Sequence, residues 1–382
     1  MAKITELGPN AKLIGKIGSR NLLSTPALVL DLDCLERNIE RMKTYANSKN
    51  IALRPHCKTH KSAIIAQLQI DAGATGITAA TLGEAEVMAD AGVTGILVSS
   101  PIIADSKIDR LMKINKKVKG LLQTVDNISN ASRLSMAAMN IGKPLNVLID
   151  VDVGLHRTGV ASVNEAVELV HTIVASQSLN YAGLQGYAGH IMHIESFDER
   201  ERTNLYHMNK LQDVRSALAE INLSPNIITG AGTGTYDIDA EQGIVTEMQV
   251  GSYVFMDVEY LDIKCRKNQQ WIFEPSLFVR STVVSANHSD QATIDAGLKC
   301  FSQDGPLPVF NQGTPAGSIY KFFGDEHGSV MFEGSNERLD VGSTVECLVP
   351  HCDPTVNLYD FYHCVRGNTL VDIWPIDARG LH

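Results

Sequence analysis

The sequence has 382 residues, of which 44% are hydrophobic and 20% charged, and its formal net charge is −10. This composition excludes a disordered or fibrous protein, and a chain of this length can bury a large core without disulfide bonds. The acidic balance argues against a nucleic-acid partner or a membrane surface, and no run reaches the roughly 18 apolar residues of a membrane span. The amino terminus has no apolar signal core, so we expect a cytoplasmic protein.

Short aliphatic runs alternate with longer stretches of helical spacing from Pro26 to Ile263, which is typical of a parallel sheet. Eight such units predict an α/β fold, a (β/α)8 TIM barrel, with a doubly wound open sheet as the alternative. The absence of a GxGxxG turn after the first strand favours the barrel. The strands are predicted at 51–54, 76–79, 95–99, 120–125, 145–151, 181–187, 226–229 and 247–250. The helices are predicted at 34–48, 83–91, 105–115, 127–141, 162–176 and 198–221.

The pattern changes after about residue 263, where helical spacing fades and short strands stand between Gly, Pro and Asn residues. Such strands are predicted at 278–285, 291–295, 343–348 and 370–374. We therefore predict two domains. The barrel covers residues 25–263, and a second, mostly β-strand domain covers 264–382 and includes residues 1–24.

The first barrel strand is followed by the basic run RPHCKTHK (54–61). In a barrel of this kind, functional side chains follow the strands at their carboxyl ends. A loop that binds any anion is one interpretation of this run. The other is a Schiff-base lysine, because cationic neighbours lower the pKa of a lysine and make it a better nucleophile for carbonyls. Lys58 lies nearer the strand end than Lys61, which begins the next helix, so Lys58 is the candidate.

The fifth and sixth strands are followed by DVDVGLHRTG (150–159) and YAGHIMH (187–193). The planar guanidinium of Arg157 can contact a phenolate or carboxylate oxygen, and its alternative is a salt bridge to a nearby aspartate. His190 and His193 are candidates for acid–base chemistry, although a histidine in a loop is often only solvated.

The seventh and eighth strands are followed by GAGTGT (230–235) and GSY (251–253). Backbone amides of glycine-rich turns, with neighbouring hydroxyls, can cradle an anion. Either run alone is also compatible with a tight turn. Because the loops after strands 7 and 8 are the usual phosphate site of this fold, the two together predict a phosphorylated ligand.

The second domain contains one more candidate site, PHCDPT (350–355). Pro354 disfavours helix at Asp353, so the segment is predicted to be extended. Alternate residues of an extended chain share a face, which places His351 and Asp353 together and Cys352 opposite. One imidazole and one carboxylate form a half-site for a divalent ion, with water and substrate as the remaining ligands. The alternative is a pair that binds no metal.

These motifs together resemble those of the fold-type III pyridoxal-phosphate enzymes, which have an alanine-racemase-like barrel and a β domain. Within that group the chain is similar to the D-threonine aldolase and D-serine dehydratase family, over nearly its whole length. The motifs that carry the resemblance are RPHCKTHK (54–61), DVGLHRTGV (152–160), GAGTGTYD (230–237), GSYVFMD (251–257), DEHG (325–328) and PHCDPTVNLYD (350–360).

The resemblance implies that Lys58 carries pyridoxal 5'-phosphate as a Schiff base. It implies a divalent metal, such as Mn, Mg or Co, on His351 and Asp353 beside the β-hydroxyl of a D-amino acid substrate. It also implies a homodimer. The residues that it places around the cofactor and its phosphate are Arg157, Tyr187, Gly232, Thr233, Gly234, Gly251, Ser252 and Tyr253.

Within the family, the His-x-Asp pair at 351–353, the run TVNLYD (355–360) and the MH pair ending in His193 resemble the aldolases. The related dehydratases carry His-x-Cys and bind zinc. The segment 77–85 and His156 resemble the dehydratases instead.

The leading hypothesis is a retro-aldol cleavage of a D-configured β-hydroxy-α-amino acid, such as D-threonine to glycine and acetaldehyde, by a carbon–carbon lyase. His193 would take the hydroxyl proton, and the cofactor would hold the resulting carbanion. The alternative is a dehydratase of D-serine or 3-hydroxy-D-aspartate, which releases an oxo acid and ammonia and uses zinc. A third hypothesis, a non-catalytic carrier of pyridoxal phosphate, is disfavoured by the His-x-Asp pair.

Overall fold

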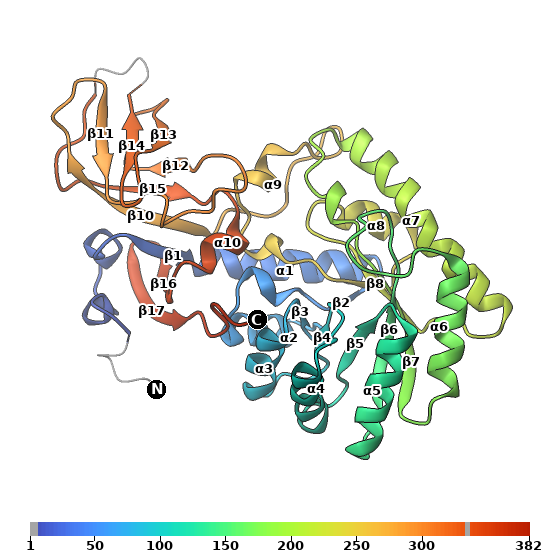
Figure 1. The fold of residues 1–382 in the computed structure, drawn as a ribbon. Coiled ribbons are helices and arrows are strands. Elements are labelled where there is room, and N and C mark those ends of the chain that lie inside the picture. Colours follow the sequence, from blue (N-terminus) through green and yellow to red (C-terminus); the bar gives the residue numbers. More distant parts are fainter. Residues whose placement is uncertain (1–6, 333–336) are drawn as a thin grey trace.

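The computed structural model describes residues 7–332 and 337–382, and its strands form two sheets (Figure 1). An eight-stranded parallel sheet with helices around it occupies the middle of the chain. A nine-stranded, mostly antiparallel sheet is built from the two ends of the chain. The predicted fold, a (β/α)8 barrel with a second β domain, is confirmed. Over these residues, no helix combines the length and the apolar character needed to cross a bilayer.

The parallel sheet contains all eight predicted barrel strands, paired in the order β2-β9-β8-β7-β6-β5-β4-β3. Beyond β2, a further parallel bridge joins His56 to Thr78 of β3, so the sheet curls until its end strands meet. All carboxyl ends therefore lie at one mouth. The strands are β2 (Ala52–Leu53), β3 (Thr78–Ala79), β4 (Leu97–Val98), β5 (Leu122–Val125), β6 (Leu145–Asp150), β7 (Leu179–Gly186), β8 (Ile227–Gly230) and β9 (Glu247–Met248).

A helix follows each strand from β2 to β8, and α1 (Leu32–Ser48) and α9 (Val258–Asp262) lie before and after this series. The side chains of Asn127 and Ser162 accept hydrogen bonds from backbone amides in the first turns of α5 and α6. These caps explain why the two helices begin where the sequence predicts. The helices of the series are α2 (Ala63–Asp71), α3 (Leu82–Asp90), α4 (Asp105–Lys117), α5 (Ile128–Asn140), α6 (Val163–Ala175), α7 (Phe197–Glu220) and α8 (Tyr236–Gln242).

The second sheet follows the path β13-β14-β11-β10-β1-β16-β17, and β15 pairs with both β10 and β12. The four strands predicted for this domain are present as β10, β11, β15 and β17. The strands are β1 (Ala27–Asp31), β10 (Leu277–Ser285), β11 (Gln291–Ile294), β12 (Val309–Gln312), β13 (Ile319–Phe322), β14 (Gly328–Met331), β15 (Thr344–Leu348), β16 (Phe361–Arg366) and β17 (Thr369–Pro375).

Strand β1 lies within the range predicted for the barrel, but it pairs antiparallel with β10 and parallel with β16. The chain therefore forms a strand of the second sheet before it enters the barrel. Leu13 and Leu23, which precede β1, pack in one apolar cluster with Phe278 and Leu348 of that sheet. The first six residues of the segment predicted to join this domain lie outside the described residues.

Helix α10 (Cys352–Val356) connects β15 to β16 and brings the second sheet to the barrel mouth (Figure 1). Nearby, the Tyr362 hydroxyl donates to the backbone oxygen of His60 at 2.7 Å. The Ala378 amide donates to the backbone oxygen of Lys61 at 2.9 Å. These contacts hold the loop after β2 against the second sheet.

Candidate active site

A cavity of about 300 Å³ opens at the barrel mouth. Its wall is made by the loops after seven of the barrel strands, together with β7 and α9, because parallel strands bring their carboxyl ends to one place. The lining includes seven of the residues predicted for the cofactor: Lys58, Arg157, Tyr187, Gly232, Thr233, Gly251 and Ser252.

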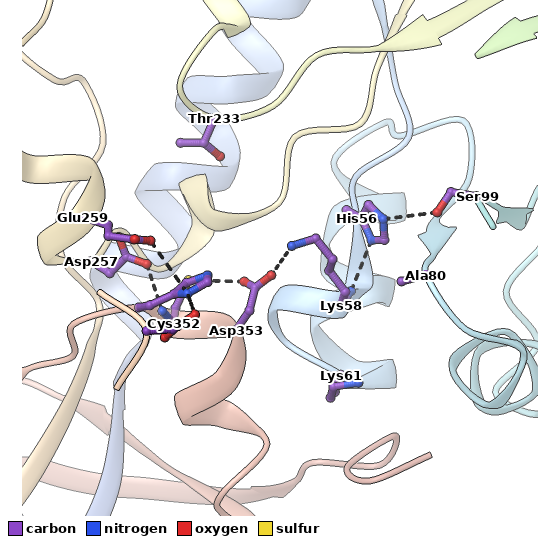
Figure 2. A network of polar contacts seen from close by, with 12 residues as sticks. His56, Lys58, Lys61, Ala80, Ser99, Thr233, Asp257, Glu259, Cys352 and Asp353 are labelled. Carbon is purple, nitrogen blue, oxygen red and sulfur yellow. Dashed lines mark hydrogen bonds and ion pairs between the residues drawn. The ribbon is translucent and has the colours of Figure 1, made fainter. Parts of the chain in front are cut away.

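Lys58 lies on a short 3₁₀ turn, Cys57–Thr59, directly after β2. The side chain of His56 caps this turn by accepting the Lys58 amide at 3.4 Å. The Lys58 ammonium donates to Oδ2 of Asp353 on α10 (Figure 2). Burial lowers the pKa of Lys58, but the Asp353 carboxylate outweighs burial and raises the pKa above its usual value. The predicted lowering of this pKa was therefore wrong, because the sequence shows the nearby cations but not a carboxylate 295 residues away.

Lys61, the other lysine of the motif, lies apart from Lys58 (Figure 2). Its ammonium donates to Oε1 of Glu84 at 2.5 Å. The second carboxylate oxygen of Glu84 accepts the amide of Ala80 at 2.8 Å, and Glu84 closes the capping box of α3 with Thr81. Lys61 thus forms a buried structural ion pair, and Lys58 is the lysine of this motif that lines the cavity.

His193 follows β7, and its ring lies 4.7 Å from that of Tyr260 between centroids. Its Nε2 is 3.6 Å from Oε2 of Glu259, and the same oxygen is 3.7 Å from Nδ1 of His351. Burial, and then the positive charges of His351 and Lys58, lower the pKa of His193 to about 4. Near pH 7 this imidazole is therefore neutral and able to accept a proton.

His351 and Asp353 are brought together by the start of α10, so the predicted extended conformation was wrong. Only His351 is extended, as the N-cap, and Pro354 stands in the first turn, where its missing amide breaks no helical hydrogen bond. The buried carboxylate of Asp257 accepts the Cys352 amide at 2.8 Å and holds this turn in place.

The electrostatic environment of His351 is dominated by carboxylates. Burial lowers its pKa, but Asp353, Asp257 and Glu259 raise it, and a contact of 2.8 Å between Nδ1 and Oδ2 of Asp304 adds to this effect. The pKa of His351 is therefore above its usual value. Asp304 and Glu259 are functional neighbours that the motifs do not reveal, because neither residue belongs to a motif or directly follows a strand.

Arg157 lies over the ring of Tyr187, with 5.7 Å from the guanidinium carbon to the ring centroid. Asp152 shapes this loop by accepting the amides of Gly154 and His156 at 2.8 and 3.0 Å. The second carboxylate oxygen of Asp152 contacts the ring of His156 at 2.7 Å. Among the described ion pairs, Arg157 has no aspartate partner, so the salt bridge considered from the sequence is not formed.

The loops after β8 and β9 form a wall suited to an anion. The amides of Gly232, Thr233 and Gly251 donate to no acceptor within the described part of the chain. A Cβ at Gly251 would lie 2.6 Å from Oγ1 of Thr59, so any larger residue at this position would force Thr59 to shift. Free amides beside the Ser252 side chain are the groups that bind a phosphate.

Two residues predicted for the cofactor lie outside the cavity lining. The Tyr253 ring packs against Phe273 at 5.5 Å, and its hydroxyl accepts from Gln69 at 3.0 Å. The backbone oxygen of Gly234 accepts from Arg200 at 2.8 Å. Contact between either residue and a cofactor stays a prediction.

Two family models match the chain. Residues 30–259 match "Alanine racemase, N-terminal domain", and residues 276–365 match "Putative serine dehydratase domain". The chain is 36% identical to D-threonine aldolase of Arthrobacter sp., over 94% of this chain and 93% of that protein. It is 35% identical to 3-hydroxy-D-aspartate aldolase of Paracoccus denitrificans, over 94% and 92%.

A solved structure, D-threonine aldolase from Filomicrobium marinum, superposes with a TM-score of 0.89 at 36% identity and covers 94% of this chain and 96% of that one. Similarity to a dehydratase is weaker. The D-threo-3-hydroxyaspartate dehydratase of Delftia sp. is 26% identical, over 92% of this chain and 97% of that protein.

Proposed function

We propose the function of this chain from the premise that it belongs to the alanine racemase N-terminal domain family, in which it is a lyase of the D-threonine aldolase type. The chain cleaves a D-configured β-hydroxy-α-amino acid into glycine and an aldehyde, with D-threonine giving acetaldehyde. The observation that carries this proposal is the position of Lys58, which lines the mouth cavity and donates to Asp353 of the His-x-Asp pair.

The cavity fits pyridoxal 5'-phosphate. The Lys58 amine would hold the aldehyde carbon of the cofactor, with Arg157 and Tyr187 beside the ring. The free amides of Gly232, Thr233 and Gly251, with Ser252, would hold its phosphate. When bound, the cofactor supplies an electron sink for the carbanion that remains after C–C cleavage.

His351 and Asp353 supply one imidazole nitrogen and one carboxylate oxygen, the donors that a borderline or hard divalent ion takes. Within residues 7–332 and 337–382, no group of three His, Cys, Asp or Glu side chains is placed to hold a metal ion. The proposed ion, Mn²⁺, Mg²⁺ or Co²⁺, would therefore take its remaining ligands from water and substrate. His193, neutral near pH 7, takes the proton of the substrate β-hydroxyl.

Product analysis tests the proposal. The purified chain, loaded with pyridoxal phosphate and Mn²⁺, is incubated with D-threonine, and glycine, acetaldehyde and ammonia are measured. We expect glycine and acetaldehyde in equal amounts and no ammonia, and we expect no reaction with L-threonine. Ammonia without glycine would show that the chain is a dehydratase. Full turnover by Lys58→Ala would contradict the role of Lys58.

We also propose that the chain is a homodimer, as the resemblance to this family implies. Sedimentation equilibrium of the cofactor-loaded protein should give twice the chain mass of 41.5 kDa. A species of single-chain mass at micromolar concentration would contradict this.

A further inference from the structure

Asp304 belongs to none of the motifs, yet its carboxylate is 2.8 Å from the ring of His351. We infer that Asp304 is a positioning residue that fixes the tautomer of His351, and so presents the other ring nitrogen to a divalent cation. This inference rests on the proposed function in one respect, which is that His351 is a ligand of the metal ion.

The tautomer follows from the chemistry of the contact. A carboxylate oxygen only accepts hydrogen bonds, so Nδ1 of His351 must carry the hydrogen that it donates to Asp304. In the neutral ring, the lone pair is then on Nε2, and only a nitrogen with a lone pair binds a metal ion. A carboxylate placed behind a ligating histidine in this way orients the ring and makes it a stronger ligand.

Asp304 is not a freely moving surface side chain, although its side chain is 53% exposed. Two residues earlier in the same loop, Ser302 is hydrogen bonded to both backbone groups of His351, each at 3.1 Å. The Ser302 amide also donates to Oγ1 of Thr355 on α10 at 3.0 Å. The loop therefore holds the backbone of His351 and places a carboxylate on its ring.

The alternative is that Asp304 acts only by adding negative charge near the cation. A control variant at Asp262 distinguishes this alternative from the hydrogen-bond role. Asp262 lines the neighbouring hollow together with His193 and Glu259. Its carboxylate is not among the acceptors that contact His351 within the described residues. Asp262→Ala and Asp304→Ala therefore remove the same charge, but only the second removes the hydrogen bond.

The experiment measures Mn²⁺ affinity of the cofactor-loaded protein by calorimetry, without substrate. We expect Asp304→Ala to weaken Mn²⁺ binding about 10- to 100-fold, the usual effect of removing such a partner, and Asp262→Ala to weaken it less than about threefold. The visible absorbance of the bound cofactor should be unchanged in both. ¹⁵N spectra of the histidines should show Nδ1 of His351 protonated in the original chain and mixed tautomers in Asp304→Ala.

Equal Mn²⁺ affinity in Asp304→Ala and the original chain would overturn the inference, as would equal weakening by both variants or no Mn²⁺ binding at all. Because no readout uses turnover, failure of the proposed function is distinguishable. If D-threonine is not cleaved but the two variants differ as expected, the role of Asp304 stands and the reaction is wrong. If cleavage occurs and the variants do not differ, only this inference fails.

Discussion

Of the two lysines in the loop after β2, Lys58 lines the mouth cavity, whereas Lys61 forms a buried ion pair with Glu84. Single substitutions should therefore separate their roles. Lys58→Ala should abolish the visible absorbance of the lysine–cofactor Schiff base and lower kcat at least about 1000-fold, because it removes the amine that we propose as the nucleophile. Lys61→Met should keep that absorbance. It should lower the free energy of unfolding by about 3–5 kcal/mol, because it leaves the buried Glu84 carboxylate without its cation.

Both variants are measured by absorbance with added cofactor and by urea unfolding. Glu84→Gln combined with Lys61→Met is the control, because removing both charges should restore part of the lost stability. A Schiff base in Lys58→Ala, or its absence in well-folded Lys61→Met, would reverse the assignment of the two lysines.

The lowered pKa of His193 predicts how kcat depends on pH. Burial and neighbouring positive charge lower this pKa to about 4, so the ring should remain an unprotonated base down to about pH 5. With an ordinary pKa near 6.5, a base would instead lose activity below about pH 7. We expect His193→Gln to lower kcat about 100- to 10,000-fold. The original chain should show no loss of kcat assignable to His193 between pH 8 and 5.5.

The measurement is the pH profile of kcat. It is recorded for the original chain and for Tyr260→Phe, a control variant that removes only the tyrosine hydroxyl and keeps an aromatic ring beside His193. A drop in kcat centred near pH 6.5 that is absent from the residual activity of His193→Gln would show that the pKa is not lowered.

Single residues could be predicted from the sequence where a strand end fixes their position. The sequence favours Lys58 over Lys61 because Lys58 lies nearer the end of its strand, and of the two lysines the structure places only Lys58 at the cavity. The partners of such residues could not be predicted. Asp353 contacts Lys58 across 295 residues, and Asp304 contacts His351 from an irregular loop, so no local pattern marks either pair.

At the scale of elements, one buried side chain connects α9 to α10. Oδ1 of Asp257 accepts the amide of Tyr260 in α9 at 3.1 Å, and Oδ2 accepts the amide of Cys352 in α10 at 2.8 Å. Asp257→Ala leaves two buried amides without acceptors, so we expect the free energy of unfolding to fall by about 2–4 kcal/mol. Because α10 carries Asp353 and has His351 as its N-cap, Mn²⁺ affinity should fall more than cofactor affinity.

Asp257→Asn is the matched control, because it keeps one acceptor oxygen and should lose about half as much stability. Urea unfolding and Mn²⁺ calorimetry of both variants check this prediction. A loss below about 0.5 kcal/mol in Asp257→Ala would mean that water replaces the carboxylate at both amides.

The regular elements followed from periodicity, and the exceptions have physical causes. Helix α2 is apolar over most of its surface, so no amphipathic stripe marks it, and α8 has only seven residues. Helix α10 was missed because proline disfavours helix at the preceding residue, yet the first turn of a helix tolerates it. Strand β1 falls in the range predicted for the barrel, because a short aliphatic run does not show which sheet it joins.

At the scale of the whole molecule, the candidate site is formed where two independently patterned sheets meet. The barrel contributes Lys58, Arg157 and His193, and the second sheet contributes His351 and Asp353 through α10. Each set could be found in the sequence as a motif. Their meeting depends on how the two sheets pack, which neither motif encodes.

The charge at this junction predicts substrate preference. A hollow of about 460 Å³ adjoins the site and is lined by His193, Glu195, Glu259 and Asp262, with Ile263 and Pro306. The nearby cation Lys264 is already paired with Glu195 at 2.7 Å. The pKa of Glu259 shows the effect of the negative charge around this hollow. Burial, and then the carboxylates of Asp257, Asp304 and Asp353, raise the pKa of Glu259 to about 7 although His351 opposes them.

A substrate carboxylate at this position would meet the same burial and repulsion, whereas a methyl group would not. We therefore expect kcat/KM for D-threonine to exceed that for 3-hydroxy-D-aspartate at least tenfold. A tenfold ratio corresponds to about 1.4 kcal/mol. One pair of like charges about 4 Å apart costs about 1 kcal/mol in water and about 4 kcal/mol at the surface of a protein.

The ratio should shrink in 0.5 M salt, which screens exposed charges beyond a few ångströms, and in Asp262→Asn, which removes one charge from the hollow. Asp109→Asn, an exposed residue of α4 that does not line the hollow, is the control and should leave the ratio unchanged. Kinetics with both substrates at low and high salt provide the measurement. Equal or reversed kcat/KM values in the original chain would mean that the carboxylates of the hollow do not face the β-substituent, and that the substrate enters from another side of the cavity.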